Sequence, residues 1–340
     1  MALRKTLAAL LAAASILVLL PAAQAGASVP SNWDKGFNFT TWWNDTLGTQ
    51  ASAASMDQMT TTHANSIAIV VTWYQADATS TTMAPDSRTP SDAAITTAIS
   101  RARARGLKVM LVPHVDSNDG VWRGSLTPTS ASTWFANYTK MLVHYADLAR
   151  TNKVAQLSVG TEFKSLSGST YSNSWKSLIA SVRQHFNGSL TYAANWDEYK
   201  SVNWWGSLNV IGVDGYFPLT LDPYTPMTAD QIAAAWNQYY MADLQAVTKT
   251  YGRPLEFTEV GYTSTASNVF KPFQVLGAYD ADAQVRAFNG LFQAFKSQPW
   301  FRGMYIWNWD GGWTGSGGSS DTSWLVQNKP AQSTITNWFS

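Results

Sequence analysis

Eight short apolar runs recur along the chain, and this recurrence constrains the fold more than any other feature of the sequence. The runs cover residues 36–41, 66–72, 108–113, 154–159, 189–194, 209–214, 255–260 and 303–307. Each run is apolar over most of its length rather than at every second residue, which is typical of strands buried on both faces. Such strands occur in parallel sheets that are covered by helices.

Helical patterns fill most of the segments between these runs. Residues 91–105 begin with a serine suited to cap a helix and precede Gly106, a common helix terminator. Two further segments carry apolar residues at a helical period of 3.6: Trp134, Tyr138, Met141, Leu142, Tyr145 and Leu148, and Val285, Phe288, Leu291, Phe292 and Phe295. Eight strands with intervening helices predict the α/β class and a single (β/α)8 TIM barrel. Residues 195–208 leave room for a helix of only one or two turns.

A doubly wound open sheet is the alternative to a barrel. Such a sheet usually carries a Gly-rich phosphate-binding turn after its first strand, and residues 35–38, Lys-Gly-Phe-Asn, do not resemble one. No Pro- or Ser-rich linker divides the chain. The Gly- and Ser-rich stretch at 311–320 lies too near the C-terminus to separate two domains. We expect it to form a loop at the barrel rim that moves when a ligand binds.

The first 25 residues read as a secretory signal peptide. Arg4 and Lys5 precede an apolar stretch over 7–20, and residues 23–25, Ala-Gln-Ala, form a small-residue cleavage site. A membrane anchor is the alternative, but the apolar stretch is shorter than the roughly 20 residues that span a bilayer. We therefore predict a secreted protein whose catalytic domain covers residues 26–340. The chain has no cysteine, which excludes disulfides, thiol nucleophiles and Cys-based zinc sites.

The composition favours a carbohydrate ligand over a nucleic acid. The formal net charge is +1 and only 13% of the residues are charged, so the chain lacks the basic surface that nucleic acid requires. The 340 residues include 17 tryptophans. The indole ring offers a flat apolar face and one N–H donor, and sugar rings can use both. An aromatic-rich core is the alternative explanation.

Polar and aromatic residues follow the predicted strands, at the end where barrel enzymes carry their active sites. In chain order they are Asn38, Trp42, Trp43, Trp73, Tyr74, Gln75, His114, Asp116, Trp122, Arg123, Glu162, Asn195, Trp196, Asp197, Asp214, Tyr216, Glu259, Tyr262, Trp307, Asn308, Trp309 and Asp310. A barrel with a purely structural role has no reason to gather such residues on one rim. We therefore place the functional site at these strand ends.

Glutamate is scarce, and its placement is the most informative single feature of the rim. The chain has only Glu162, Glu198, Glu256 and Glu259, and two of them end the fourth and seventh strands. A pair of carboxyl groups across a barrel mouth suits glycoside hydrolysis, in which one attacks the anomeric carbon and the other protonates the leaving oxygen. Glu162 could instead cap the following helix. Glu256 lies three residues before Glu259, and residues an odd number apart in a strand point to opposite faces. Glu256 is therefore expected to face the helix layer or a salt bridge. Glu198 is expected at the solvated rim.

His114 and Asp116 could be metal ligands or contacts for sugar hydroxyls. The sequence has no HExxH motif and no third clustered ligand beside them. We therefore predict sugar contacts, and neither a metal nor a cofactor.

Seven of these strand-end segments resemble clan A glycoside hydrolases, and most closely the β-mannanases of glycoside hydrolase family 113. The segments are residues 35–39 (KGFNF), 112–116 (VPHVD), 160–163 (GTEF), 191–196 (TYAANW), 211–217 (IGVDGYF), 257–262 (FTEVGY) and 305–309 (YIWNW). The likeness extends from about residue 34 to residues 328–331. It therefore covers nearly all of the chain after residue 25.

The resemblance implies a retaining mechanism with Glu259 as nucleophile and Glu162 as acid/base. One departure concerns the residue before the acid/base, which is usually an Asn that binds the 2-hydroxyl of the substrate and is Thr161 here. Asn195 or His114 could hold that hydroxyl instead. Trp307 by position would form the floor of the subsite where cleavage occurs.

We thus expect a monomeric, secreted endo-β-1,4-glycosidase that cleaves mannan or glucomannan. A β-1,4-glucanase or xylanase of the same clan is the alternative, and a non-catalytic glycan-binding barrel is a second one that the two strand-end glutamates disfavour. Tyr216 or Tyr262 would position the nucleophile. The expected substrate-binding residues are Asn38, Trp42, Trp73, His114, Asp116, Trp122, Asn195, Trp196, Asp214, Tyr216, Tyr262, Trp307 and Trp309.

Overall fold

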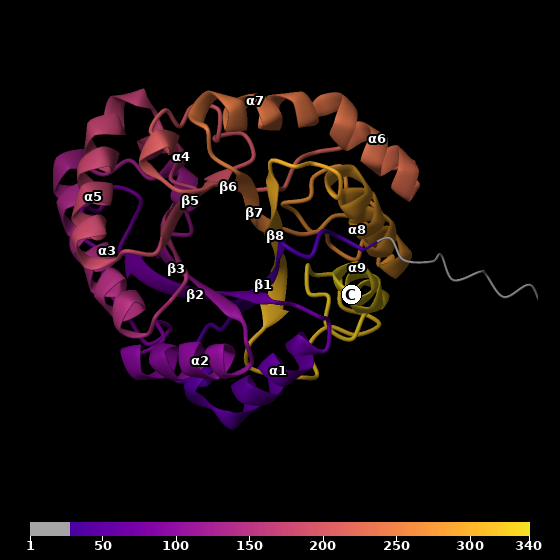
Figure 1. The fold of residues 1–340 in the computed structure, drawn as a ribbon, viewed down its shortest axis with the longest axis horizontal. Helices are drawn as coiled ribbons and strands as arrows, with labels where there is room; N and C mark the ends of the chain where they lie inside the picture. The colour runs from indigo at the N-terminus through magenta and orange to yellow at the C-terminus, as the bar shows by residue number, and fades with distance from the viewer. Residues whose placement is uncertain (1–27) are drawn as a thin grey trace, which may run out of the picture.

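The chain folds into a closed barrel of eight parallel strands, as the sequence predicts (Figure 1). The structure is a computed structural model that describes residues 28–340, so the expected signal peptide lies outside the described residues. The strands are β1 (Asp34–Thr40), β2 (Ser66–Gln75), β3 (Lys108–Ser117), β4 (Gln156–Thr161), β5 (Ser189–Asn195), β6 (Ile211–Asp214), β7 (Leu255–Val260) and β8 (Phe301–Asp310). Each strand pairs with its neighbours in sequence, and β8 closes the barrel against β1.

Helices surround the barrel on its outer face (Figure 1). They are α1 (Gln50–Thr60), α2 (Asp92–Ala104), α3 (Ala131–Thr151), α4 (Lys164–Ser167), α5 (Ser172–His185), α6 (Ala229–Tyr239), α7 (Met241–Tyr251), α8 (Ala281–Phe295) and α9 (Pro330–Phe339). The Ser91 hydroxyl caps α2 by accepting from the Ala94 N–H, and Gly106 follows it with φ of +77°. The connection from β5 to β6 holds only the 3-10 turn Trp205–Ser207, which agrees with its short length. Within residues 28–340, no helix combines the length and apolar character needed to cross a membrane.

Much of the aromatic content lies between the barrel and the helices rather than at a ligand site. Seven of the 17 tryptophans are less than 2% exposed: Trp33, Trp134, Trp175, Trp204, Trp205, Trp236 and Trp309. Trp175 of α5 stacks on Trp204 with ring centroids 4.6 Å apart. The aromatic-rich core therefore accounts for these seven tryptophans, and the role of the exposed ones stays a prediction.

The barrel interior is small, and aliphatic residues fill its middle. Ala68, Val70, Met110 and Val112 pack there with Tyr305 of β8. Gly36 of β1 faces the same ring, and a Cβ at this position would lie 2.4 Å from Tyr305 Cδ1. A side chain at residue 36 would therefore displace the tyrosine that fills the barrel.

A network of charged and polar groups occupies the amino-terminal end of the barrel. Asp34 of β1 accepts from Lys108 Nζ at 3.0 Å and from Arg302 Nε at 2.6 Å. Glu256 of β7 accepts from the Gln156 side chain, and Arg302 Nε lies 3.8 Å from Glu256 Oε2. This network closes the floor of the barrel, at the opposite end from the two strand-end glutamates.

The expectation that Glu256 and Glu259 lie on opposite faces of β7 is wrong, although a salt bridge to Glu256 is present. The register of β7 shifts against both neighbours, between Val213 and Asp214 of β6 and between Phe257 and Val260 of β7 opposite β8. The simple alternation of faces therefore breaks down. Glu256 lies in the floor network, and Glu259 lies at the barrel mouth.

Glu256 makes the stability of the fold pH-dependent. Burial raises the pKa of Glu256 from 4.5 to about 7, with Asp34 adding to the shift and Arg302 opposing it. Because the folded state holds this proton more tightly than the unfolded state, the stabilisation is complete below pH 4.5 and is lost as the pH rises toward 7. Glu256→Gln should flatten this dependence, which chemical denaturation between pH 4 and 8 measures. Asp45→Asn, at an exposed carboxylate, serves as control, and an unchanged slope in Glu256→Gln would contradict the assignment.

Candidate active site

Two glutamates lie at the carboxyl ends of β4 and β7, on the face where barrel enzymes carry their active sites. Glu259 lies within β7, next to its last residue, and Glu162 directly follows β4. The Glu162 backbone has φ of 54°, an uncommon conformation for a residue other than glycine, and its N–H donates to Ala193 O of β5 at 2.7 Å. Glu162 is 9% exposed and Glu259 is 7% exposed. The barrel mouth thus presents two poorly solvated carboxyl groups.

Two N–H donors hold the Glu162 carboxyl group. Trp122 Nε1 donates to Glu162 Oε2 at 3.0 Å, and Arg123 Nη1 donates to the same oxygen at 3.3 Å. Arg123 also donates through Nε and Nη2 to Asp116 Oδ1, at 2.9 and 2.7 Å. One guanidinium therefore joins Asp116 of β3 to Glu162. The sequence placed Arg123 at the rim but gave it no role, because a lone arginine beside Trp122 carries no signal of its own.

Glu198 supports the backbone around Glu162, so the expectation of a solvated rim residue is wrong. Glu198 has no solvent exposure. Its Oε1 accepts from Tyr192 OH at 2.5 Å, and its Oε2 accepts from the Asn195 N–H at 2.9 Å. Tyr192 OH in turn accepts from the N–H of Phe163, the residue after Glu162, at 2.8 Å. Glu198 thus contributes to the geometry of the β4 end from inside the fold.

Tyr216, and not Tyr262, contacts Glu259. Tyr216 OH donates to Glu259 Oε2 at 2.7 Å, and the Gly215 N–H donates to Glu259 O at 2.6 Å. Tyr262 is fully buried on the helix side of the barrel, where its hydroxyl accepts from Trp236 Nε1 at 3.3 Å. The expectation that Tyr262 could contact the nucleophile or the substrate is therefore wrong.

The two glutamates have raised pKa values for a shared reason. Burial raises the pKa of Glu162, while Arg123 and Trp122 oppose this shift. Burial raises the pKa of Glu259, and repulsion from Glu162 adds to it while the Tyr216 hydroxyl opposes it. Two interacting carboxyl groups in such a site lose their protons in separate steps. The pair can therefore hold one acid and one base at the same pH.

Three other predicted polar residues lie around this pair. Asn38 Nδ2 donates to Thr258 O at 3.0 Å and to Tyr305 O at 3.3 Å. His114 is 1% exposed, and burial and Arg123 lower its pKa to about 3, so its ring is neutral. Asn195 is 8% exposed, and its Nδ2 donates to Asp197 Oδ1 at 3.1 Å.

Four of the predicted tryptophans lie at or near the mouth. Trp42 is 48% exposed and Trp122 is 41% exposed, and both line a hollow of about 380 Å³ together with Tyr74, Arg88 and Asp116. Trp307 packs onto the aliphatic cluster inside the barrel. Trp196 stacks on Phe273 with ring centroids 6.1 Å apart. Of these four rings, Trp122 is the one that contacts Glu162.

Trp73 and Trp309 do not line the cleft, so that expectation is wrong for both. Trp73 Nε1 donates to Tyr145 OH of α3 at 2.7 Å. Trp309 is fully buried, and its Nε1 donates to Ser55 Oγ of α1 at 3.0 Å. Trp73 occupies an outward position on β2, since alternate residues of a strand face opposite sides. Trp309 faces outward although Trp307 faces the barrel interior, because the register of β8 against β1 shifts between Ile306 and Trp309. Nearness to a strand end therefore did not decide which way these rings point.

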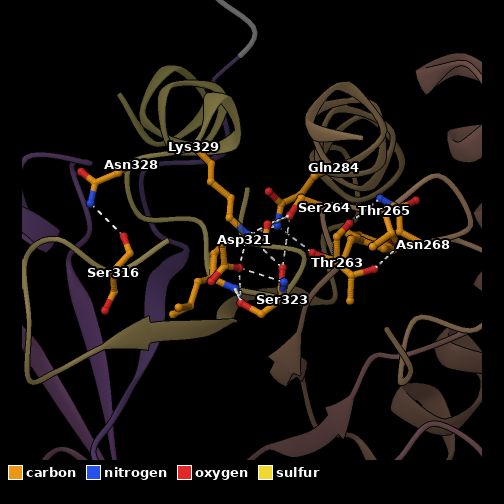
Figure 2. Close-up of polar contacts among 12 residues, drawn as sticks. Thr263, Ser264, Thr265, Asn268, Gln284, Ser316, Asp321, Ser323, Asn328 and Lys329 are labelled. Carbon is orange, nitrogen blue, oxygen red and sulfur yellow. Dashed lines mark hydrogen bonds and ion pairs between the residues drawn. The ribbon is translucent and has the colours of Figure 1, made fainter. Parts of the chain in front are cut away.

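The segments that follow β7 and β8 are tied together beside the mouth (Figure 2). Lys329 is 3% exposed, and its Nζ donates to Ser264 Oγ and Asp321 Oδ1, both at 2.8 Å, and to Ser323 O at 3.0 Å. Gln284 Nε2 donates to Tyr262 O at 2.8 Å. These contacts fix the segment that directly follows the strand bearing Glu259.

The Gly- and Ser-rich stretch at 311–320 is held at its start and in its middle. The Gly311 N–H donates to Thr40 O at 2.9 Å. Asn328 Nδ2 donates to Thr314 O and Ser316 O, each at 2.8 Å, and Figure 2 shows the contact to Ser316. Trp313 in this stretch is 64% exposed. The expected movement on ligand binding stays a prediction.

Among residues 28–340, no group of three or more His, Asp or Glu side chains is placed to hold a metal ion.

Comparison with known proteins identifies the family. A model of glycoside hydrolase family 113 matches residues 31–329. The chain belongs to this family. The match confirms the resemblance of the strand-end segments to glycoside hydrolase family 113.

Two solved structures of family 113 are similar to this family member over most of its length. The β-mannanase AaManA from Alicyclobacillus acidocaldarius, in complex with ManMIm, is 26% identical over 91% of this chain and 97% of that chain, with a TM-score of 0.81. A β-1,4-mannanase of the family is 24% identical over 91% of this chain and 99% of that chain, also with a TM-score of 0.81. A β-glucuronidase from Ruminococcus gnavus shares the fold, at 14% identity over 91% of this chain and 50% of that chain, with a TM-score of 0.59. No curated protein sequence matches.

Tyr216→Phe tests the contact to Glu259 in this family member. Loss of a hydrogen bond to a charged group costs about 1.5–3 kcal/mol, so we expect kcat/KM to fall roughly 10- to 100-fold. Tyr262→Phe removes a buried hydroxyl on the helix side of the barrel and is the matched control. Steady-state kinetics of the two variants measure the effect, and an equal loss in both would contradict the specific role of Tyr216.

Lys329→Met tests the anchoring of the two segments in Figure 2. Lys329 is buried but Asp321 is partly exposed, so the variant loses hydrogen bonds to a partly solvated carboxylate and to two further oxygens, and we expect a loss of about 1–3 kcal/mol in the free energy of unfolding. Lys140→Met, at an exposed lysine of α3, is the control. Urea unfolding measures both, and a loss in Lys329→Met no larger than that of the control would show that the anchor contributes nothing.

Proposed function

We propose that the protein is a retaining endo-β-1,4-mannanase that uses Glu259 as nucleophile and Glu162 as acid/base. The observation that carries this proposal is the pair of buried glutamates at the ends of β4 and β7, whose charges interact across the barrel mouth. Family membership supports glycoside hydrolysis as the reaction. The similar family-113 structures are named β-mannanases, which supports mannan or glucomannan as substrate.

In the first step, the Glu259 carboxylate attacks the anomeric carbon while Glu162 gives its proton to the departing glycosidic oxygen. The bond from the anomeric carbon to the leaving sugar breaks, and a glycosyl ester of Glu259 forms. The hydrogen bond from Tyr216 OH orients the attacking carboxylate. The raised pKa of Glu162, which follows from its burial, keeps a proton available for this step.

In the second step, Glu162 is ionised and takes a proton from water. The water attacks the anomeric carbon, the ester to Glu259 breaks, and Glu162 regains its proton. Arg123 and Trp122 stabilise the ionised Glu162 that this step requires, because both donate to its Oε2. The contacts around Glu162 thus suit a residue that alternates between the two protonation states.

The exposed rings suit a polysaccharide chain as the ligand. Trp42 and Trp122 border the hollow beside Glu162 and offer flat faces to sugar rings.

We also propose that the protein is secreted and that residues 1–25 are removed on export, because those residues carry the pattern of a signal peptide.

Product analysis on a polysaccharide panel tests the function, with mannan, glucomannan, xylan, soluble cellulose and mixed-linkage glucan as substrates. We expect oligosaccharides from mannan or glucomannan with the wild-type enzyme. Release only from xylan or a glucan would overturn the substrate and keep the mechanism. Binding of labelled oligosaccharide without release from any polymer would overturn the enzymatic proposal in favour of a glycan-binding barrel.

Glu259→Ala and Glu162→Ala test the two roles separately. Glu259→Ala should lose several orders of magnitude in kcat, and added azide should restore turnover by forming a glycosyl azide. Glu162→Ala should lose less on substrates with an activated leaving group, which need no proton from the enzyme. Glu256→Gln, at the other glutamate of β7, is the matched control and should keep its activity. Near-normal turnover in Glu259→Ala would show that the nucleophile is another residue.

A further inference from the structure

A third carboxyl group lies directly beside Glu259. Asp214 is the last residue of β6, and it pairs in register with Glu259 on β7. It has no solvent exposure, whereas Glu259 is 7% exposed. The next two residues, Gly215 and Tyr216, donate to the backbone and the side chain of Glu259. Three consecutive residues at the end of β6 therefore lie against Glu259, and of their side chains that of Asp214 is the most buried.

The expectation that Asp214 contacts the substrate is wrong for this structure, because substrate in the cleft would not reach a fully buried side chain.

Asp214 has a single neutral donor. Thr258 Oγ1 donates to Asp214 Oδ1 at 2.7 Å, and Asp214 Oδ2 has no hydrogen-bond partner among the described residues. Within residues 28–340, no Lys, Arg or His side chain lies within ion-pair distance of Asp214, although such pairs exist for Asp116 and Glu162. A buried carboxylate without a cation and without several donors is strongly unfavourable.

The charged and titratable groups that face Asp214 also disfavour its ionised form. Glu259 on β7 and Glu162 after β4 are acidic, and Tyr216, which follows β6, is neutral. Among the described residues, the cation that acts on Asp214 is Arg123, which is already bonded to Asp116 and Glu162. Burial, followed by repulsion from Glu259 and Glu162, raises the pKa of Asp214 well above its ordinary value, in agreement with the geometry.

We propose that Asp214 keeps its proton throughout the reaction and acts as a neutral positioning residue beside the nucleophile. The inference rests on the proposed function, since it concerns the nucleophile assigned there. A protonated Asp214 can accept from Thr258 through one oxygen and donate through the other. Glu259 accepts from Tyr216 OH and is the better solvated of the two, so it is the group that ionises. The proton that is transferred during catalysis is then the proton of Glu162, and the proton of Asp214 is not transferred.

Asp214→Asn tests the protonation state, because asparagine has the shape of the neutral acid and cannot ionise. We expect kcat to fall by no more than roughly tenfold, the size of one neutral hydrogen bond, and both limbs of the pH profile of kcat/KM to keep their wild-type positions. Asp116→Asn is the matched control. It removes a carboxylate that is paired with Arg123, so both limbs should move to lower pH, since loss of a negative charge favours ionisation of its neighbours.

A shift of both limbs to lower pH in Asp214→Asn, with a loss of kcat far above tenfold, would overturn the proposal, because it would mean that the wild-type residue carries a charge. A second readout does not depend on activity. In wild-type enzyme labelled with ¹³C at the aspartate Cγ, one resonance should keep the shift of a carboxylic acid from pH 5 to pH 8. It should be absent from Asp214→Asn. Lack of such a resonance in the wild type would overturn the proposal even if the variant failed to fold, whereas wild-type inactivity on every polysaccharide would contradict only the proposed function.

Discussion

The burial of several carboxyl groups around one guanidinium is the interaction on which the site depends. Glu162, Glu259 and Asp214 lie in a mouth that solvent scarcely reaches, and the contacting cation is Arg123. Because like charges in such a place cannot all be present together, the groups must differ in how they hold protons. Each has a different set of donors: an arginine and an indole for Glu162, a phenol for Glu259 and a threonine hydroxyl for Asp214. Burial raises the pKa of all three groups, and among the described residues Glu162 alone of the three is in ion-pair contact with a cation.

The rest of the fold holds those donors in place. The aromatic layer between barrel and helices fixes the strands from outside, and the charged floor around Asp34 fixes them from below. Glu198 and Tyr192 support the backbone that follows Glu162. Lys329 links the segments after β7 and β8. A site that needs positions fixed to within about 0.5 Å is supported in this way by packing and by outer hydrogen bonds.

The sequence was sufficient to predict the barrel and the positions of the two strand-end glutamates, because continuous apolar runs and scarce residue types are visible without a structure. It was not sufficient to predict which way side chains point near the ends of strands. Trp73 faces the helices because β2 keeps its alternation beyond the expected end. Trp309 faces the helices because the register of β8 against β1 shifts between Ile306 and Trp309. The register shift in β7 turned Glu256 inward, and no local pattern marks such a shift. Arg123 and Glu198 both act on the end of β4, which is distant from them in sequence, and one sequence alone does not identify that contact.

In the proposed double displacement, Glu259 acts as nucleophile and Glu162 as acid/base. Proton NMR of the first product formed during hydrolysis of a β-1,4-linked mannan chain tests this mechanism most directly, because it records the anomeric configuration before the sugar equilibrates. A double displacement predicts that the β-anomer forms first and then converts to the equilibrium mixture. Initial release of the α-anomer would contradict this mechanism, since it would mean a single displacement by water with Glu259 as a base.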